Sequence, residues 1–399
     1  MSGDADGGDD PAYSTDLRDL ASRLVQIPTE NPPGDEAEAA RCVYDWFTDA
    51  GIDATLLEAP DPDRPQVAAR VGTGGPTVVL NGHLDVVPAG DETAWSVDPY
   101  GGVVRNGRLY GRGSADMKTG LAIAMLVARD LAPEIRSGAL EGSTVVHAAM
   151  GEETADPGTL TLLERGFDGD YGIVLEPTDF RVATSSKGLA VYRLTVRGEA
   201  THASQPDDGT NAVDELRAVL RAIDRYDDEL RARPRSLCGR ALATVTEVEA
   251  GTDSNLAVVP DRAELVLDRR VGPDETLSAV DDEVKALVSR LQEEQGCTLS
   301  WRRIQEYDSA SIPVDHPLAT CFRKRVVEAV GPDGGVDEPW GIEAATDVRN
   351  FVTDAGIPAV TWGPGRLEEA HTVDESISLE RATVGRDVLE RAVRDLLAR

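Results

Sequence analysis

The sequence predicts an α/β protein in which a mostly parallel sheet domain is interrupted by a smaller inserted domain. Three observations lead to this fold class. The chain has 399 residues, which is more than one ordinary hydrophobic core supports, so two domains are expected. Apolar strand patterns alternate with helical patterns in residues 16–175, and a different order of strands and helices follows between residues 186 and 303.

In the first region, apolar residues recur at the spacing of amphipathic helices, and then in short runs typical of buried strands. Alternation of the two is typical of a mostly parallel sheet, in which loops at the carboxyl ends of the strands form the binding site. The expected helices are residues 16–26, 36–50 and 120–130, and the expected strands are 66–71, 77–81, 144–149 and 172–175.

The second region has the order β-α-β-β-α-β, which is the ferredoxin-like unit and is complete in itself. We therefore expect residues 186–303 to form an inserted domain. The surrounding α/β domain would comprise residues 1–185 and 304–399, with 1–12 as a disordered tail. The insert is expected to have strands at 190–196, 241–248, 263–268 and 297–304 and helices at 211–231 and 277–293, and a final helix is expected at 379–397.

The net charge of −32 at neutral pH restricts the partners of the protein. A nucleic-acid binder would carry basic stripes, and an anionic membrane surface would repel a chain this acidic. Only four of the 40 basic residues are lysines. Such an acid-rich, lysine-poor composition indicates a halophilic protein whose self-repulsion is screened by high salt. An unusually acidic mesophilic protein is the alternative.

The remaining composition points to the cytoplasm. Four cysteines are scattered without a close pair, a pattern that fits a reducing compartment and excludes cysteine-based zinc fingers. The first ten residues are acidic and do not resemble a signal peptide. The longest apolar run, near residues 121–128, is far shorter than a membrane span.

Several segments carry histidine or acidic residues where a metal site would need them. His83 closely follows the expected strand at 77–81, and Asp85 comes two residues later, as expected of a metal ligand and the carboxylate that orients its ring. Asp116 lies in a glycine-containing turn before an apolar helix, where one carboxylate can bridge two metals. The alternatives are a satisfied loop histidine for His83, and a helix cap or anion-binding loop for Asp116.

Glu152 and Glu153 follow the apolar strand at 144–149. Two adjacent carboxylates are costly there unless a cation lies between them. Adjacent side chains point in different directions, so one can bind metal while the other contacts the metal-bound water. A solvated acidic loop is the alternative. Glu176 repeats this placement after the next strand, and His371 lies in an acidic segment near the end of the chain.

Together and in this order, these segments resemble the zinc-dependent family of acetylornithine deacetylase, succinyl-diaminopimelate desuccinylase, aminoacylase and carboxypeptidase G. The resemblance extends from residue 27 to residue 375. It implies a two-metal hydrolase that acts on C–N amide bonds, with zinc as the metal and cobalt or manganese as alternatives. The ligands that it implies are His83, Asp116 and Glu176 for one metal, and Asp116, Glu153 and His371 for the other.

The same resemblance implies roles for residues around the metals. Asp85 would orient His83, and Glu152 would be the general base that takes a proton from the water between the metals and passes it to the departing amine. The insert would be a lid and dimerisation domain whose His202 reaches a partner subunit's site and stabilises the oxyanion. This implies a homodimer. A surface histidine that precedes a helix is the alternative for His202.

Three further residues match regions of substrate binding in that family. Arg270 is the candidate ligand of a substrate carboxylate, with a surface ion pair as the alternative. Arg349 lies in a segment that resembles the edge of the substrate pocket. The family's usual asparagine is replaced here by Ala257, so Asn255 is the nearest substitute. Of the other histidines, His147 is expected to be a packed core residue and His316 is assigned no role.

The function expected from these residues is hydrolysis of an N-acyl amino acid, of the acetylornithine deacetylase or succinyl-diaminopimelate desuccinylase type. A dipeptidase or carboxypeptidase of the same family is the alternative. A catalytically silent protein, which binds amino-acid derivatives or serves as an assembly partner, would be expected to have lost ligands, whereas this set is complete and includes Glu152. A serine hydrolase is excluded because the chain has no G-x-S-x-G motif.

Overall fold

The computed structural model describes residues 13–251, 256–295 and 298–398. Their contacts separate into two compact units. The described residues of Met1–Thr184, Ile312–Trp340 and Asn350–Arg399 form the first unit, and those of Ser185–Ser311 and Gly341–Arg349 form the second. The second unit thus includes residues 304–311 and 341–349, which the sequence-based boundaries assigned to the surrounding domain.

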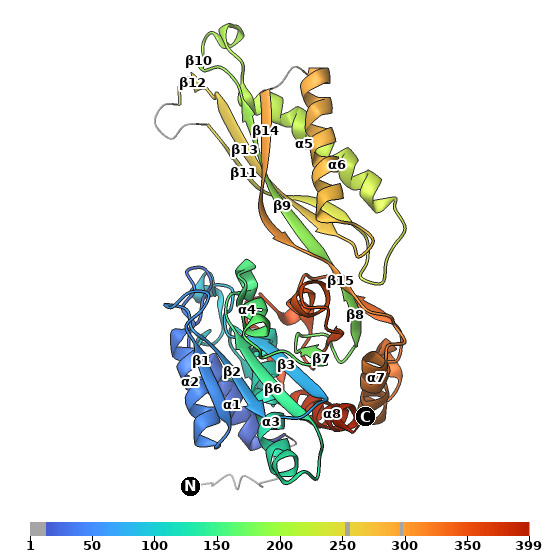
Figure 1. Cartoon of the computed structure of the whole chain (residues 1–399). Helices are drawn as coiled ribbons and strands as arrows, with labels where there is room; N and C mark the ends of the chain where they lie inside the picture. The colour runs from blue at the N-terminus through green and yellow to red at the C-terminus, as the bar shows by residue number, and fades with distance from the viewer. Residues whose placement is uncertain (1–12, 252–255, 296–297, 399) are drawn as a thin grey trace, which may run out of the picture. The chain divides into compact units, whose positions relative to one another are not determined.

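A mixed sheet forms the centre of the first unit (Figure 1). In spatial order, seven of its strands are β1 (Asp53–Leu57), β2 (Gln66–Val71), β6 (Ser143–Ala149), β3 (Thr77–His83), β7 (Tyr171–Val174), β17 (Ala359–Thr361) and β8 (Ala183–Ser186). The short strands β15 (Ala310–Ser311) and β16 (Trp340–Ile342) both pair with β8. The central strands β6, β3, β7 and β17 are parallel, whereas β1, β2 and β8 pair antiparallel.

The expectation of a mostly parallel sheet is therefore corrected to a mixed one. The reason lies in the connections, because a parallel pair requires a crossover of about a dozen residues or more, usually with a helix. The loop from β1 to β2 is shorter than this and carries no helix, so the two strands pair antiparallel.

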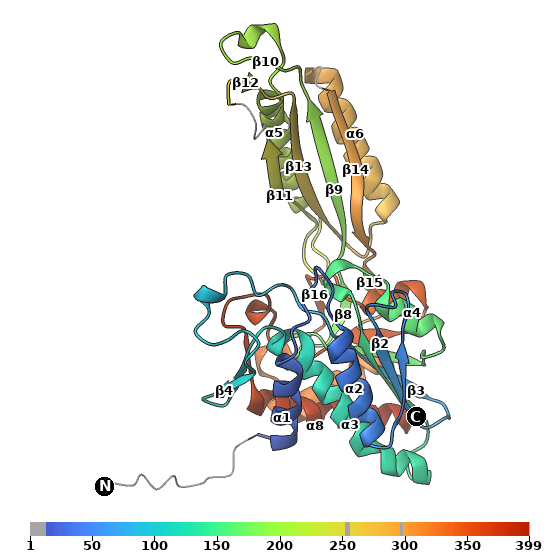
Figure 2. The same ribbon diagram turned by 90° about the vertical axis from the view of Figure 1, so that its left-hand side faces the viewer.

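Helices cover both faces of this sheet, which is why every residue of β6 is buried. Alternate residues of a strand point to opposite faces: Val67 and Ala69 of β2 join the larger core, while Ala68 between them contacts the smaller one. Figure 2 shows α1, α2 and α3 on the same side of the sheet. The helices of the larger core are α1 (Thr15–Val25), α2 (Ala37–Asp49), α3 (Thr119–Ser137), α7 (Pro317–Val330) and α8 (Leu379–Leu397), and α4 (Gly158–Glu164) contributes to the smaller core.

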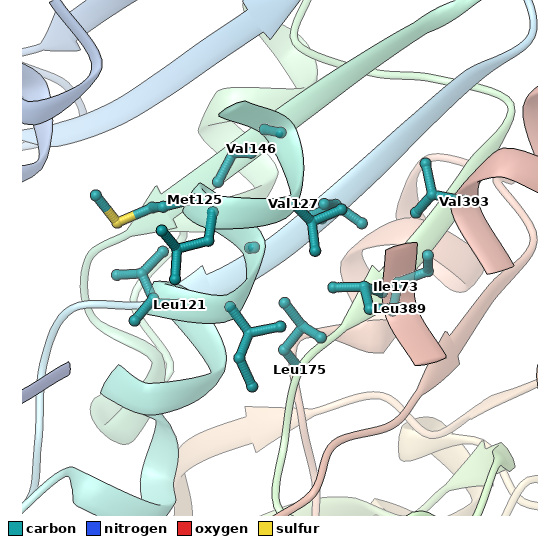
Figure 3. Packing of buried hydrophobic residues seen from close by; sticks show 14 of the residues in the cluster. Leu121, Met125, Val127, Val146, Ile173, Leu175, Leu389 and Val393 are labelled. Carbon is teal, nitrogen blue, oxygen red and sulfur yellow. The ribbon is translucent and has the colours of Figure 1, made fainter. Parts of the chain in front are cut away.

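The C-terminal helix α8 is part of the larger core, far in sequence from the strands that it covers. Figure 3 shows side chains of α8 close to those of α3 and β7. After its last contribution to the second unit, at Gly341–Arg349, the chain thus ends in the core of the first unit. The residues labelled there are Leu121, Met125 and Val127 of α3, Val146 of β6, Ile173 of β7, Leu175, and Leu389 and Val393 of α8.

A small three-stranded sheet in the first unit joins two distant segments. Its order is β18 (Ser376–Ser378), β5 (Arg108–Tyr110) and β4 (Val103–Arg105). Ser376 is paired with Tyr110. The residues just before β18 and just after β5 are therefore held next to each other, and these are the segments that carry His371 and Asp116.

The second unit has a four-stranded antiparallel sheet with two helices on one face (Figure 1). In spatial order, its strands are β11 (Leu242–Ala250), β13 (Arg262–Val271), β9 (Gly188–Arg197) and β14 (Thr298–Tyr307), and its helices are α5 (Ala212–Arg231) and α6 (Leu277–Gln295). Along the chain, these elements follow the order β-α-β-β-α-β. The short strands β10 (Thr201–His202) and β12 (Val258–Val259) form a separate antiparallel pair in this unit.

Within the described parts of the chain, every helix is too short or too polar to cross a lipid bilayer.

Candidate metal centre

The carboxyl ends of three parallel strands bring acidic and histidine side chains to one edge of the first-unit sheet. His83 is the last residue of β3, Glu152 and Glu153 lie in the short helical turn after β6, and Glu176 follows β7. Parallel neighbours end at the same edge of a sheet, so residues distant in sequence meet there. This edge is where the sequence predicted the site.

Two sets of three side chains bring their ligand atoms within 4.8 Å of one another. His83, Asp116 and Glu176 form one set, and Asp116, Glu153 and His371 form the other. Asp116 belongs to both sets and uses a different oxygen in each. Its Oδ1 lies 3.3 Å from His83 Nε2, and its Oδ2 lies 3.4 Å from His371 Nε2.

One glutamate completes each set. Glu176 Oε1 lies 3.9 Å from His83 Nε2, and Glu153 Oε1 lies 3.2 Å from His371 Nε2. The structure thus brings together all five residues that the sequence singled out as ligands. His83, Asp116 and Glu176 are buried, whereas the side chain of His371 is 49% exposed.

Close backbone contacts shape the turns around this cluster. Gly113 has φ of +83°, and a Cβ there would lie 2.6 Å from Val86 Cγ1, so only glycine fits before the turn that carries Asp116. A Cβ on Gly363 would lie 2.4 Å from the main-chain oxygen of Glu176. These two glycines let neighbouring segments approach closely enough for the ligands to meet.

The contact between His83 and Asp85 runs through the main chain. His83 Nδ1 lies 2.8 Å from the main-chain oxygen of Asp85, while the nearest carboxylate oxygen is 3.6 Å away. An Nδ1–H that donates to this carbonyl leaves Nε2 free to bind a metal. The carboxylate of Asp85 instead accepts hydrogen bonds from the main-chain N–H groups of Glu152 and Glu153, at 3.2 and 3.1 Å.

Asn31 supports this arrangement, although no sequence motif pointed to it. Its buried amide donates to Asp85 Oδ2 at 2.9 Å and to Thr154 Oγ1 at 2.7 Å. The amide therefore connects Asp85 to the turn after β6 through two hydrogen bonds. A lone asparagine in a loop carries no signal of such a contact, because its partners are far away in the sequence.

Glu375 is a second buried carboxylate that, like Asp85, holds a turn of the main chain. Its Oε1 accepts hydrogen bonds from the main-chain N–H groups of Ala115 and Asp116, at 2.9 and 3.1 Å. Its Oε2 lies 2.6 Å from Arg112 Nη1 in a buried ion pair. Arg112 and Glu375 lie inside the segments that the sequence identified, but neither was expected to have a role.

The cluster contains more buried acid than base. Burial raises the pKa of Glu176 well above its ordinary value and also raises that of Glu153. Burial alone would raise the pKa of Asp116 too, but contacts with His371 and His83 hold it below its ordinary value. Asp116 and Glu153 in turn raise the pKa of His371 to about 10. Such a cluster either binds protons or needs another cation.

The donor chemistry fits divalent metal ions. Each set offers one imidazole nitrogen and two carboxylates, which suits zinc as well as cobalt or manganese. A carboxylate that presents separate oxygens to two ligand sets is the arrangement expected of a bridge between paired metals. Buried carboxylates without a cation would be costly, so the residues present agree with a two-metal site.

The other candidate residues lie in the second unit. His202 is exposed and its Nδ1 lies 2.8 Å from Ser204 Oγ. Arg270 pairs with Asp268 through Nε at 2.9 Å and Nη2 at 3.1 Å. The guanidinium of Arg349 stacks on Tyr307, 3.9 Å from the ring centre.

Asn255 lies outside the described residues, and the cluster of five ligand candidates lies entirely in the first unit. Two other histidines also have clear contacts. His147 is fully buried, as expected of a core residue, and His316 accepts a hydrogen bond from Leu318 N at the start of α7.

Comparison with known proteins now decides the family. The model of peptidase family M20/M25/M40 matches residues 79–395. The chain belongs to this family. A succinyl-diaminopimelate desuccinylase from Methylobacterium radiotolerans is 30% identical over 381 residues, which cover 91% of this chain and 93% of that protein. An N-formyl-4-amino-5-aminomethyl-2-methylpyrimidine deformylase from Bacillus subtilis is 24% identical, covering 92% of each chain.

Solved structures of the M20 family share the fold over nearly the whole chain. The metallo-carboxypeptidase Sso-CP2 from Sulfolobus solfataricus matches with a TM-score of 0.78 at 17% identity, covering 97% of this chain and all of that one. An M20 peptidase from Bacillus subtilis, described as dinuclear metal binding, matches with a TM-score of 0.68 at 15% identity, covering 96% and 98%. The expected family is confirmed, and the protein is an M20 enzyme of the class that hydrolyses amide bonds.

Proposed function

We propose that the protein is a two-metal hydrolase that cleaves the amide bond of an N-acyl amino acid. The observation that carries this proposal is the double use of Asp116, whose two oxygens face two separate ligand sets. The acetylornithine deacetylase or succinyl-diaminopimelate desuccinylase type is favoured, because the desuccinylase of Methylobacterium radiotolerans is 30% identical over almost the whole chain.

Under this proposal, His83, Asp116 and Glu176 hold one metal, and Asp116, Glu153 and His371 hold the other. Zinc is the first choice, with cobalt and manganese as alternatives. When bound, such ions lower the pKa of a water molecule and polarise the scissile carbonyl.

Glu152 is the proposed general base. It lies in the same short turn as the ligand candidate Glu153. Burial and Asp116 raise the pKa of Glu176, and the negative charge of Glu152 adds a smaller contribution in the same direction. Glu152 takes a proton from the attacking water and delivers it to the departing amine. The Asp85 carboxylate holds the turn that carries Glu152, and the Asp85 carbonyl fixes the tautomer of His83.

The second unit is proposed to supply substrate contacts. We assign the second unit, most of which is the expected insert at residues 186–303, to a ferredoxin-like lid and dimerisation domain, and the first unit to the catalytic domain. His202 would stabilise the oxyanion in the site of a partner subunit of a homodimer. Arg270, Arg349 and Asn255 are the proposed substrate contacts, and Arg270 would have to release Asp268 to bind a substrate carboxylate.

A dipeptidase or carboxypeptidase is the second candidate, since solved relatives include human carnosine dipeptidase 1, with a TM-score of 0.75. A silent protein that binds amino-acid derivatives or serves in an assembly is disfavoured, because all five ligand candidates and Glu152 are present. A hydrolysis screen separates these functions. N-acetyl and N-succinyl amino acids and dipeptides would be tested in high salt with Zn²⁺ or Co²⁺. Turnover of dipeptides alone would replace the first candidate by the second, and no turnover would favour the silent protein.

Replacement of the proposed base tests the mechanism. We expect Glu152→Gln to lower kcat by about 10²–10⁴-fold, the usual contribution of a positioned acid or base. The metal content, measured by elemental analysis, should stay at the wild-type value because Glu152 is not a proposed ligand. Glu164→Gln removes one negative charge from an exposed position at the end of α4 and is the matched control. A kcat within twofold of wild type in Glu152→Gln would refute the assigned base.

A further inference from the structure

The ligand candidates Asp116 and His371 come from segments more than 250 residues apart in the chain. The small sheet aligns these segments only at their ends, where Tyr110 pairs with Ser376. His371 itself has φ of +59° and a half-exposed side chain, so its neighbours must hold it in place. The contacts that fix one segment against the other therefore matter for the metal site.

Glu375 makes the most direct of these contacts. Glu375 is buried, with a side chain that is 0% exposed, and it lies four positions after His371. Three donors from the other segment point at its two oxygens. Ala115 N and Asp116 N donate to Oε1 at 2.9 and 3.1 Å, and Arg112 Nη1 donates to Oε2 at 2.6 Å.

Arg112 extends the same contact towards His371. Its Nη1 also donates to the main-chain oxygen of Thr372, the residue after His371, at 3.2 Å. The guanidinium lies over Trp95, 5.3 Å from the ring centre. Arg112 is therefore held by its own surroundings and binds the segment of His371 at both a side chain and a carbonyl.

We infer that Glu375 is a positioning residue, which together with Arg112 fixes Asp116 and His371 relative to each other and so sets the affinity of their metal ion. The inference rests on the proposed two-metal function. Glu375 contacts only the main chain of Asp116. Both carboxylate oxygens of Asp116 therefore stay available to the two ligand sets. Partners that orient metal ligands in this way typically contribute about 10–100-fold to metal affinity or activity.

The donor geometry makes Glu375→Gln a sharp test. A carboxylate accepts hydrogen bonds through both oxygens, whereas an amide has one acceptor and one donor. In either amide orientation, the –NH₂ group would face Arg112 or the pair of main-chain N–H groups. The variant keeps the size of the side chain but must lose one of the two contacts.

The experiment is titration of metal-free protein with Zn²⁺ by calorimetry, combined with thermal unfolding of the same metal-free samples. We expect Glu375→Gln to weaken the binding of one zinc ion by about 10–100-fold. The kcat at limiting zinc should fall while KM changes little, and excess zinc should restore most of the activity. A purely structural role would lower the unfolding temperature but would not change zinc affinity in the folded protein.

Glu275→Gln is the matched control in the second unit. Glu275 accepts a main-chain hydrogen bond from Gly272 at 2.8 Å and pairs with the buried Arg269. This variant should lose stability but keep wild-type zinc affinity. If Glu375→Gln does not fold, Arg112→Lys provides the test, because lysine keeps the charge but cannot reach Glu375 and Thr372 in the same planar geometry.

The outcomes separate the inference from the function on which it rests. Wild-type zinc affinity in Glu375→Gln, or in Arg112→Lys if only that variant folds, would overturn the positioning role while the wild type still binds two ions and hydrolyses substrate. A wild type that binds no zinc, cobalt or manganese would overturn the proposed function and the inference with it.

Discussion

Asp85 and Glu375 have the same structural role at two places in the site. Each is a buried carboxylate that accepts hydrogen bonds from two successive main-chain N–H groups, those of Glu152 and Glu153 or those of Ala115 and Asp116. A turn held in this way presents its side chains in fixed directions. The acid content of the site therefore has two parts, one that faces the metal positions and one that shapes the backbone around them.

His147 gives a prediction about pH at the residue scale. Its ring is fully buried and its Nε2–H donates to Phe167 O at 2.8 Å, and burial lowers its pKa from 6.5 to about 4. Between these two values the unfolded chain holds a proton that the folded chain does not. The contribution of neutral His147 to the free energy of unfolding is therefore fully present above pH 6.5. It is lost as the pH falls through this window, by up to about 3 kcal/mol.

The prediction is checked with His147→Gln, which cannot titrate. When the pH is lowered from 6.5 to 4, the free energy of unfolding should fall by about 3 kcal/mol less in the variant than in wild type. Urea unfolding at a series of pH values, in constant high salt, measures this difference. Parallel loss of stability in the two proteins would show that another group is responsible for the acid sensitivity.

At the scale of elements, most of the strands and helices could be predicted from the sequence because their apolar periodicity is strong. The strand at 66–71 was predicted with the bounds that β2 has. The helix expected to end at residue 130 instead continues through Pro133 to Ser137. Leu131 and Ile135 of this last part are buried, so tertiary packing outweighs the usual effect of proline on a helix.

The candidate site also has residues that could be predicted from the sequence and residues that could not. Residues such as His83 and Glu176 could be predicted because a polar residue at the end of a buried strand is a local feature of the sequence. The contacts of Asn31 and Glu375 could not, because they connect residues 54 and 260 positions apart. Local patterns therefore found the ligand candidates but not the groups that hold their backbone.

The packing of α8 gives a prediction at the element scale. Leu389 is fully buried in the core that includes α3 and β7 (Figure 3). We expect Leu389→Ala to lower the free energy of unfolding by about 2–5 kcal/mol, because the truncation leaves a cavity between elements that cannot close in easily. Arg391→Ala, at an exposed position of the same helix, is the control and should change stability by less than about 0.5 kcal/mol. Equal effects of the two changes would contradict this account of α8.

At the scale of the whole molecule, charge is the dominant feature. Ion pairs in the described residues use arginine far more than lysine, and several are bidentate, as between Arg325 and Asp395. Screening by salt weakens exposed pairs, each of which contributes only about 0–1 kcal/mol. It also relieves the mutual repulsion of a chain with a net charge of −32. The balance between these two effects decides how the protein responds to salt.

We expect relief of repulsion to dominate, so that the unfolding temperature rises steeply with KCl. The Debye length falls from about 10 Å at 0.1 M to about 3 Å at 1 M, so repulsion between separated surface carboxylates is largely removed over this range. Thermal unfolding from 0.1 to about 3 M KCl measures the effect. A variant with glutamine at three exposed positions, Glu38, Glu92 and Glu164, has less repulsion to screen and should gain less from salt. An unfolding temperature that does not change with KCl would mean that the acidic surface is not an adaptation to high salt.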